Sequence, residues 1–415
     1  MSRALPFNSS FCILTSAFSR VFGLTAGAGC GMVYAVVTME ALNTYIQGVT
    51  SATPWLLPLF FGLFGACIGS FLNVVIYRMP RGLNVNEPRR SFCPLCKAPI
   101  PWYLNLPVLS YLMLRGRTAC CGRHYTARYC VVELVCALLF AAVAWYFCTD
   151  DIITQVLLCV WVAVMLACLC IDWEQMVVLP SLALLATLAG VGVNALSPWF
   201  SGEGVEPLDG LLGSGAGAFG GFLLFRLVAI AGKFFFGRRR QEFESDTPWV
   251  LRQAADGEDV ELLLGGERLL WSALFMESTN RFTLTAATEG THAAEPGALV
   301  FTVDTLTLPD GTSISLEEHD ELRGTCRGYA ARKEAMGSGD AWLALAIGAL
   351  CGWQGVVFAL VGGSFIGIAA ALVARIGRGT PMPFGPALIS AALVWLFYGV
   401  ELSAAYLGWV ESLLW

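Results

Sequence analysis

Long apolar runs constrain this 415-residue chain more than any other feature of its sequence. A helix needs ~20 consecutive apolar residues to cross a bilayer. A shorter run, residues 341–353, is either a tilted or re-entrant half-helix or the beginning of the run that follows it. The sequence therefore predicts a polytopic α-helical membrane protein with about eight transmembrane segments. The other runs lie at residues 54–77, 129–148, 152–171, 178–197, 209–236, 354–376 and 385–412.

Basic residues indicate how the chain is oriented in the bilayer. The loop at residues 78–128 contains nine Lys or Arg residues and one acid, Glu87. Short loops rich in Lys and Arg remain on the cytoplasmic side of a membrane. Residues 198–208, which contain no Lys or Arg, are expected on the opposite side. We therefore predict a cytoplasmic Cys-rich loop and a multi-pass protein of the cell inner membrane.

The net charge of −6 belongs to one polar segment. Residues 238–334 hold 10 of the 25 basic and 18 of the 31 acidic residues, and the rest of the chain is nearly neutral. This distribution predicts no nucleic-acid partner. Within the segment, β-prone stretches flank Leu308-Pro309-Asp310-Gly311, and Pro-Asp-Gly is a turn signal. We predict that this segment is a β-rich soluble insert between the membrane helices.

The predicted domains follow from these boundaries. Residues 1–53 are an N-terminal extension of uncertain status: a signal-like segment, an extra span or an upstream extension of the translated chain. The remaining divisions are the first membrane helix (54–77), the Cys-rich loop (78–128), membrane helices carrying Asp172 (129–237), the insert (238–334) and a C-terminal membrane region that begins with a Gly-rich motif (335–415).

Two aspartates are the strongest candidates for catalysis. Asp172 ends one apolar run, and Asp340 begins another, directly after Gly337-Ser338-Gly339. An ionisable group at membrane depth is costly, at about 3 kcal/mol, and is a functional candidate by default. Two carboxylates in a low-dielectric site share a proton, so one can deprotonate water while the other polarises a carbonyl. Gly337 and Gly339 allow close backbone approach.

The motif Gly337-Ser338-Gly339-Asp340 resembles the GxGD motif of intramembrane aspartyl peptidases. Further segments resemble those of type IV prepilin peptidases, in the family's order along the chain. They are residues 69–80 (GSFLNVVIYRMP), 105–111 (NLPVLSY), 114–117 (LRGR), Arg128-Tyr129 with Glu133, and 383–386 (PFGP).

This resemblance implies the activity and its partners. The expected reaction is cleavage, after a glycine, of the short basic leader of type IV prepilins or type II secretion pseudopilins at the cytoplasmic face. Many family members then methylate the new N-terminus with S-adenosylmethionine. By this resemblance Asp172 and Asp340 are the catalytic pair.

The Cys-rich loop departs from the family's pattern of two Cys-x-x-Cys pairs. The first pair is intact as Cys93 and Cys96, but Thr118 stands where another cysteine is expected. Zinc takes four nitrogen or sulfur ligands in a tetrahedron. Cys93, Cys96, Cys121 and His124 could form a Cys₃His zinc site, with Cys120 as the competing fourth ligand. The alternative is a partly decayed site whose thiols simply pack.

Two other classes of function compete with the peptidase. A scaffold or substrate-binding component of the pilus or secretion machinery would keep the fold without turnover, but the intact Asp pair argues against it. A transporter using Asp172 and Asp340 as a proton relay would leave the Cys-rich loop and the first-helix motif unexplained.

Overall fold

The fold is available as a computed structural model. It describes residues 43–87, 93, 96, 98–101, 106–124, 126–148, 151–196, 207–236, 238–253, 260–265, 267–271, 282–289, 294–316, 321–332, 337, 339–374 and 382–414. A helix spans residues 43–52 of the predicted N-terminal extension, and residues 1–42 lie outside the described part. The chain forms two compact units, residues 1–171 with 181–215 and 396–415, and residues 172–180 with 216–395.

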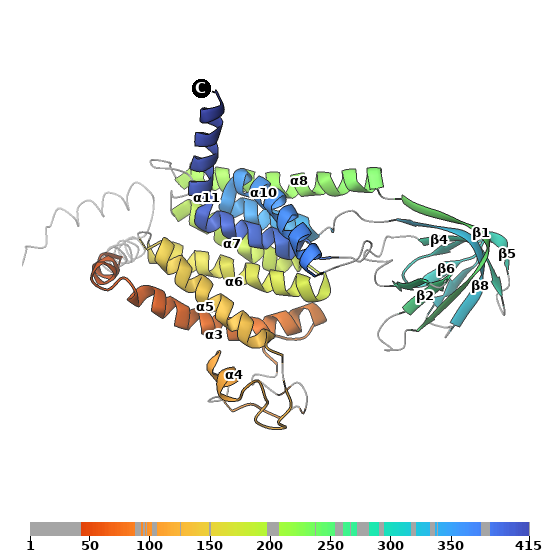
Figure 1. Cartoon of the computed structure of the whole chain (residues 1–415), viewed down its shortest axis with the longest axis horizontal. Coiled ribbons are helices and arrows are strands. Elements are labelled where there is room, and N and C mark those ends of the chain that lie inside the picture. The colour runs from red at the N-terminus through yellow and green to blue at the C-terminus, as the bar shows by residue number, and fades with distance from the viewer. Residues whose placement is uncertain are drawn as a thin grey trace, which may run out of the picture. The chain divides into compact units, whose positions relative to one another are not determined.

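Apolar helices dominate the structure, as the apolar runs predict (Figure 1). Among the described residues, six helices are long and apolar enough to cross a membrane, and α7 is shorter, with 17 residues. The polytopic membrane fold is therefore confirmed. The membrane helices are α3 (Leu56–Arg78), α5 (Arg128–Tyr146), α6 (Ile152–Gln175), α7 (Pro180–Leu196), α8 (Pro207–Phe236), α10 (Gly339–Val373) and α11 (Gly385–Leu414).

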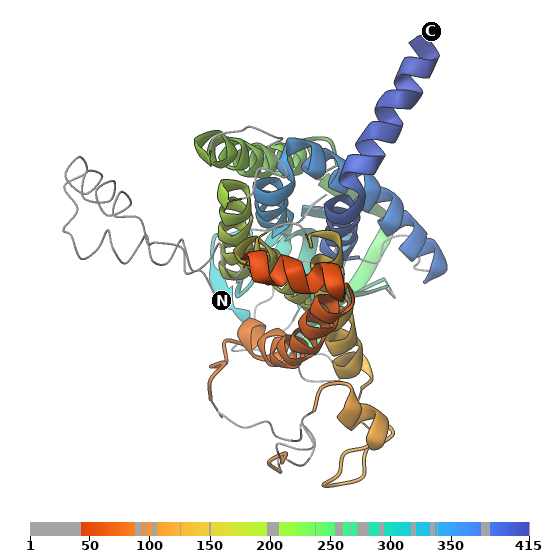
Figure 2. The same cartoon turned by 90° about the vertical axis from the view of Figure 1, so that its left-hand side faces the viewer.

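The first unit contains the pair of helices that flank the Cys-rich loop. Helices α3 and α5 lie side by side in both views (Figures 1 and 2). Asn73 of α3 donates a hydrogen bond from Nδ2 to the backbone carbonyl of Tyr129, at 3.1 Å. Between these helices the chain forms the short 3₁₀ helix η1 (Met79–Arg81) and the helix α4 (Leu109–Met113). The loop therefore begins and ends on two packed helices.

The short apolar run at residues 341–353 and the run that follows it at 354–376 belong to one helix, α10. Gly352 has φ 66° and ψ −173°, which divides α10 into two helical pieces. Only glycine adopts such angles without a steric penalty. Among the described residues, six helices are long enough to span, against the eight segments predicted, because the runs at 341–353 and 354–376 form the single helix α10 and α7 is shorter than a full span. Trp342 in the first piece stacks edge-on against Phe222 of α8, with ring centroids 5.4 Å apart.

The predicted insert folds as an eight-stranded sheet in which every pairing is antiparallel. The spatial order is β3-β2-β1-β8-β4-β5-β6-β7. The predicted turn joins β6 to β7, and Gly311 has the positive φ of 89° that this turn requires. The strands are β1 (Arg238–Gln253), β2 (Val260–Leu264), β3 (Glu267–Leu270), β4 (Phe282–Glu289), β5 (Ala294–Phe301), β6 (Thr305–Thr307), β7 (Ser313–Ser315) and β8 (Glu321–Arg332).

Aromatic side chains form the core of this sheet. Trp249, Phe282 and Phe301 are almost completely buried. Phe301 packs edge-on against the rings of both Trp249 and Trp271. The indole of Trp271 also donates a hydrogen bond to the Val303 carbonyl at 2.9 Å, so its polar atom is satisfied. The insert therefore has a hydrophobic core of its own, as a β-rich soluble domain requires.

Candidate functional site

Asp172 lies near the end of α6, where the helix is forced to stop. Met176, with φ 55°, donates its backbone N–H to the Asp172 carbonyl at 2.9 Å. A positive φ is unusual for a residue with a side chain and ends a right-handed helix. The Asp172 side chain is buried, whereas Trp173 and Glu174 beside it are exposed. Of the acids at this helix end, Asp172 is thus the one directed into the protein.

Asp340 is the second residue of α10 and is also buried. Its backbone N–H donates to the carbonyl of Gly337 at 3.3 Å, which closes the turn before the helix. A Cβ atom on Gly339 would lie 2.8 Å from Cβ of Val178, a distance that real side chains do not tolerate. Val178 belongs to the segment between Asp172 and α7. The absence of a side chain at Gly339 therefore lets the two Asp-bearing segments touch.

The two carboxyl groups lie close enough for their charges to interact directly. The Asp172 carboxylate also interacts with the backbone of Gly385, the first residue of α11. A Cβ atom on Gly385 would overlap Oδ2 of Asp172 and approach Leu343 to 2.9 Å. Oδ2 of Asp172 is buried and has no hydrogen-bond partner among the described residues. The site thus pairs two acids, with one carboxylate oxygen still available.

This arrangement suits acid–base chemistry on a water molecule. The helix N-termini of α10 and α11 place positive partial charge beside the two acids. Two neighbouring carboxyl groups cannot both ionise at low cost, so they hold one proton between them. The ionised group can then accept a proton from water while the protonated group donates a hydrogen bond to a carbonyl oxygen.

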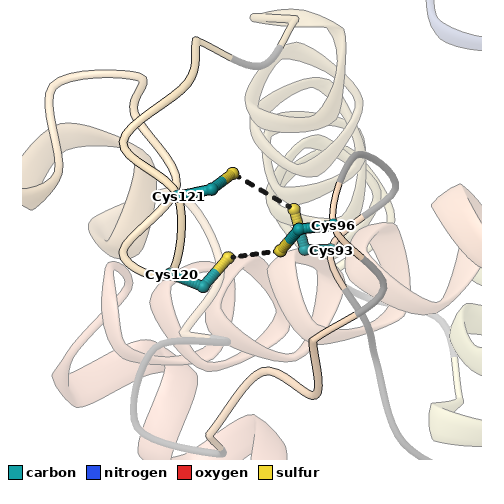
Figure 3. Close-up of side chains that lie close together, drawn as sticks. All are labelled: Cys93, Cys96, Cys120 and Cys121. Atoms are coloured by element: carbon teal, nitrogen blue, oxygen red, sulfur yellow. Dashed lines mark hydrogen bonds between the residues drawn. The ribbon is translucent and has the colours of Figure 1, made fainter.

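Four cysteines of the Cys-rich loop converge in the first unit (Figure 3). Their sulfur atoms all lie within 4.8 Å of one another. Sγ of Cys96 is 3.3 Å from Sγ of Cys120, and Sγ of Cys93 is 4.0 Å from Sγ of Cys121. With zinc–sulfur distances of ~2.3 Å, tetrahedral ligand sulfurs lie about 3.8 Å apart. The four thiols therefore fit a tetrahedral metal ion.

Cys120, the competing ligand in the sequence-based prediction, occupies the fourth position of this cluster. His124 lies outside the group and instead forms an isolated β-bridge with Arg117. The local spacing of Cys121 and His124 does not reveal this, because the turn at Gly122 (φ 67°) reverses the chain between them. The structure thus favours Cys₄ over Cys₃His.

The thiols differ in how readily they ionise. The hydrogen bond with the Thr118 hydroxyl, at 3.0 Å, is the largest of the effects that lower the pKa of Cys121 to about 7, and the Arg123 backbone assists. The hydrogen bond with Cys96 is the main cause that raises the pKa of Cys120 to about 12. Because the four sulfur atoms lie so close together, ionisation of one thiol makes ionisation of a second less favourable. A bound metal cation reverses this effect because it stabilises the thiolates.

Two residues of the Asp site went unassigned in the sequence-based reasoning. Val178 carries no motif of its own, and its role appears only in contact with Gly339. Gly385 belongs to the Pro-Phe-Gly-Pro segment, which resembles the family's last motif. The resemblance assigned no role to this glycine. A glycine followed by proline at the start of an apolar run was the available signal, since proline favours the first helical turn.

Comparison with known proteins shows which class of polytopic membrane protein has these features. It is the class of the bacterial A24 peptidases. The family model described as Bacterial Peptidase A24 N-terminal domain matches residues 63–147, which include the Cys cluster. The model described as Type IV leader peptidase family matches residues 268–372, which include Asp340. The chain belongs to the type IV leader peptidase family, as its motifs predict.

Curated relatives carry the name prepilin leader peptidase/N-methyltransferase. The protein of Myxococcus xanthus is 36% identical over 189 residues, which are 44% of this chain and 51% of that protein. That of Klebsiella pneumoniae is 44% identical over 93 residues, 21% of this chain and 40% of the relative. The chain thus spans about half the length of these two. That of Aeromonas hydrophila is 28% identical over 381 residues, 85% of this chain and 95% of the relative. No solved structure matches.

Proposed function

We propose that this chain is an aspartyl endopeptidase that removes the basic leader, after a glycine, from type IV prepilins or type II secretion pseudopilins. Asp172 and Asp340 are its catalytic residues. The observation that best supports this proposal is the contact of Gly339 with Val178. This contact brings together the two chain segments that carry the buried, interacting acids. The reaction takes place at the cytoplasmic face of the inner membrane, where basic loops are retained.

The mechanism follows from the two acids. The ionised carboxylate takes a proton from a water molecule as that water attacks the scissile carbonyl carbon. The protonated carboxyl donates a hydrogen bond to the carbonyl oxygen, which gains negative charge. The proton then passes to the leaving amine, and the C–N bond breaks. Burial of the pair strengthens these interactions because little water screens them.

The direct test is cleavage of a purified prepilin by the full chain in detergent or lipid nanodiscs, followed by mass spectrometry. A product shortened at a glycine supports the peptidase. An intact prepilin that nevertheless binds the chain supports instead the inactive scaffold of the pilus machinery.

The contact between Gly339 and Val178 offers a test by rescue. Replacing Gly339 with Ala is expected to lower cleavage, because the new methyl group overlaps Val178 and pushes the two Asp segments apart; such overpacking costs about 1–3 kcal/mol. Adding Val178→Gly removes the opposing Cβ and should restore part of the activity. Initial cleavage rates of the single and double variants are the measurement. If the double variant is no better than Gly339→Ala alone, the contact does not position the pair.

We further propose that Cys93, Cys96, Cys120 and Cys121 bind zinc as a structural site, as their spacing and chemistry allow. Such a metal would hold together two parts of the loop that lie 24 residues or more apart in the sequence, and it supplies no step of the peptidase reaction. Because the relatives' names include N-methyltransferase, we also propose that the chain methylates the new N-terminus with S-adenosylmethionine.

Metal content distinguishes the two possible fourth ligands. We expect about one zinc per chain in the wild type and a large loss in Cys120→Ser, because three thiolates hold the ion much less tightly than four. His124→Ala should retain the metal. The control Cys67→Ser, an exposed thiol on α3, should also retain it. Elemental analysis of the purified chains is the measurement. Zinc lost from His124→Ala but kept in Cys120→Ser would restore the Cys₃His assignment.

A further inference from the structure

Two neighbouring strands of the insert bring arginines together at one end of the sheet. Arg238 is the first residue of β1, Arg332 is the last residue of β8, and the two are directly opposite each other in the antiparallel pair. Opposed residues in such a pair have Cα atoms about 5 Å apart. Arg239 and Arg240 come next in β1 and pair with alanines of β8. Four arginines therefore occupy the final three residue pairs of these strands.

Three of these arginines share the outer face of the sheet, because successive residues of a strand lie on opposite faces. Tyr329 of β8 is buried in the aromatic core and so marks the inner face. Arg332, three residues later, lies on the outer face, as does Arg238 opposite it. Arg240, two residues after Arg238, belongs to this face as well. The next residue of β1 on the outer face is an acid, Glu242, and it is exposed.

The pairing of Arg238 with Arg332 is unfavourable for the sheet by itself. Like charges directly opposite each other on neighbouring strands are destabilising. Near the other end of β1 the arrangement is the reverse, because Arg252 is opposite Glu261 of β2 and forms a salt bridge of 2.8 Å with it. An anion bound between Arg238 and Arg332 would supply the negative charge that Glu261 supplies to Arg252.

The arginines directly follow a membrane helix. Helix α8 ends at Phe236, two residues before Arg238, and Lys233 lies in its last turn. Phe234 in the same turn is 84% exposed, which suits contact with lipid better than contact with water. The cluster of basic residues thus begins where the apolar helix ends.

The topology places this end of the sheet on the cytoplasmic side. Four apolar helices, α5 to α8, separate Arg238 from the basic loop at residues 78–128. Four crossings return the chain to the side of that loop, which is expected in the cytoplasm. Anionic lipids of the cytoplasmic leaflet attract Lys and Arg residues that lie next to a membrane helix.

We propose that Arg238, Arg240 and Arg332 bind the phosphate group of an anionic phospholipid, phosphatidylglycerol or one of like charge, in the cytoplasmic leaflet. Guanidinium groups bind phosphate oxygens through charge-assisted N–H···O hydrogen bonds. The bound lipid offsets the repulsion between Arg238 and Arg332 and holds this end of the insert at the bilayer surface. This role requires neither the catalytic pair nor the metal site.

Native mass spectrometry of the full chain in detergent tests the proposal without any cleavage. The chain is titrated with phosphatidylglycerol and, separately, with the zwitterionic phosphatidylcholine. We expect the wild type to bind the first phosphatidylglycerol more tightly than phosphatidylcholine. Replacing all three arginines with Gln should weaken that first phosphatidylglycerol about 100-fold, because each basic residue near an anionic surface strengthens binding about five-fold. The affinity for phosphatidylcholine should not change.

Two further variants separate charge from a folding defect. Replacing the same three arginines with Lys keeps the charge and should keep most of the affinity. Replacing Arg323 and Arg327, two exposed arginines further along β8, with Gln should leave the lipid preference unchanged. In thermal unfolding without lipid, the triple Gln variant should be at least as stable as the wild type, because the repulsion is gone. Phosphatidylglycerol should then raise the unfolding temperature of the wild type alone.

Equal binding of the two lipids by the wild type would overturn the proposal, as would a triple Gln variant that still prefers phosphatidylglycerol. Glycerol phosphate, which carries the same phosphate ester without the acyl chains, tests the other source of this ligand. An excess of about tenfold over the lipid should leave phosphatidylglycerol bound. Displacement by glycerol phosphate would assign the arginines to a soluble phosphate ester instead of the membrane.

Discussion

Cleavage by either Asp172→Asn or Asp340→Asn is expected to fall about 10²–10⁴-fold relative to the wild type, the range for removing a general acid or base. Asparagine keeps the size of the side chain but can neither accept the proton of water nor deliver one to the leaving amine. Both variants should still insert and run as a single species in size-exclusion chromatography, because a neutral amide is cheaper to bury than a charged carboxylate. Initial rates on a purified prepilin are the measurement.

Glu174→Gln is the matched control for this experiment. Glu174 lies two residues beyond Asp172 on the same helix, but its side chain is exposed. Its substitution changes the same charge without entering the site, so the rate should stay near that of the wild type. Undiminished cleavage in either Asp variant would remove the pair from the mechanism, whatever the control does.

The second large effect is expected at Gly385. Replacing it with Ala puts a methyl group onto Oδ2 of Asp172, so the carboxylate must move away from its partner and from the N-terminus of α11. A misplacement of about 1 Å in a catalytic group can reduce the rate about 10²-fold. We expect a reduction of this size in kcat with little change in KM, because the substrate-binding surface is left intact.

Gly408→Ala provides the comparison within the same helix. Apart from the adjoining residues and backbone of its own helix, no atom of the described residues lies within 4 Å of the position where its Cβ would be. Alanine favours helix by ~1 kcal/mol over glycine, so this variant should be at least as stable as the wild type and equally active. Equal activity of Gly385→Ala and Gly408→Ala would show that Gly385 does not hold Asp172 in place.

Much of the membrane fold could be predicted from the sequence, because hydrophobic length alone specifies a spanning helix. Asp172 and Asp340 could likewise be selected, since charge is rare within such runs. The break at Gly352 was not assignable, because glycine is common in apolar helices and its backbone angles depend on the surrounding packing. The fourth cysteine was ambiguous for a similar reason. Cys120 and His124 have equally suitable ligand atoms, and only the turn between them selects one.

The pairing of β1 with β8 has a consequence for how such a chain can change over evolution. The first residue of β1, Arg238, pairs with the last residue of β8, Arg332, so the two ends of the sheet are about 5 Å apart. The polypeptide therefore departs and returns as it would in a hairpin. Domains of very different length and sequence could be exchanged at this position without altering the separation of α8 and α10, which leaves the peptidase machinery and the accessory domain free to diverge independently.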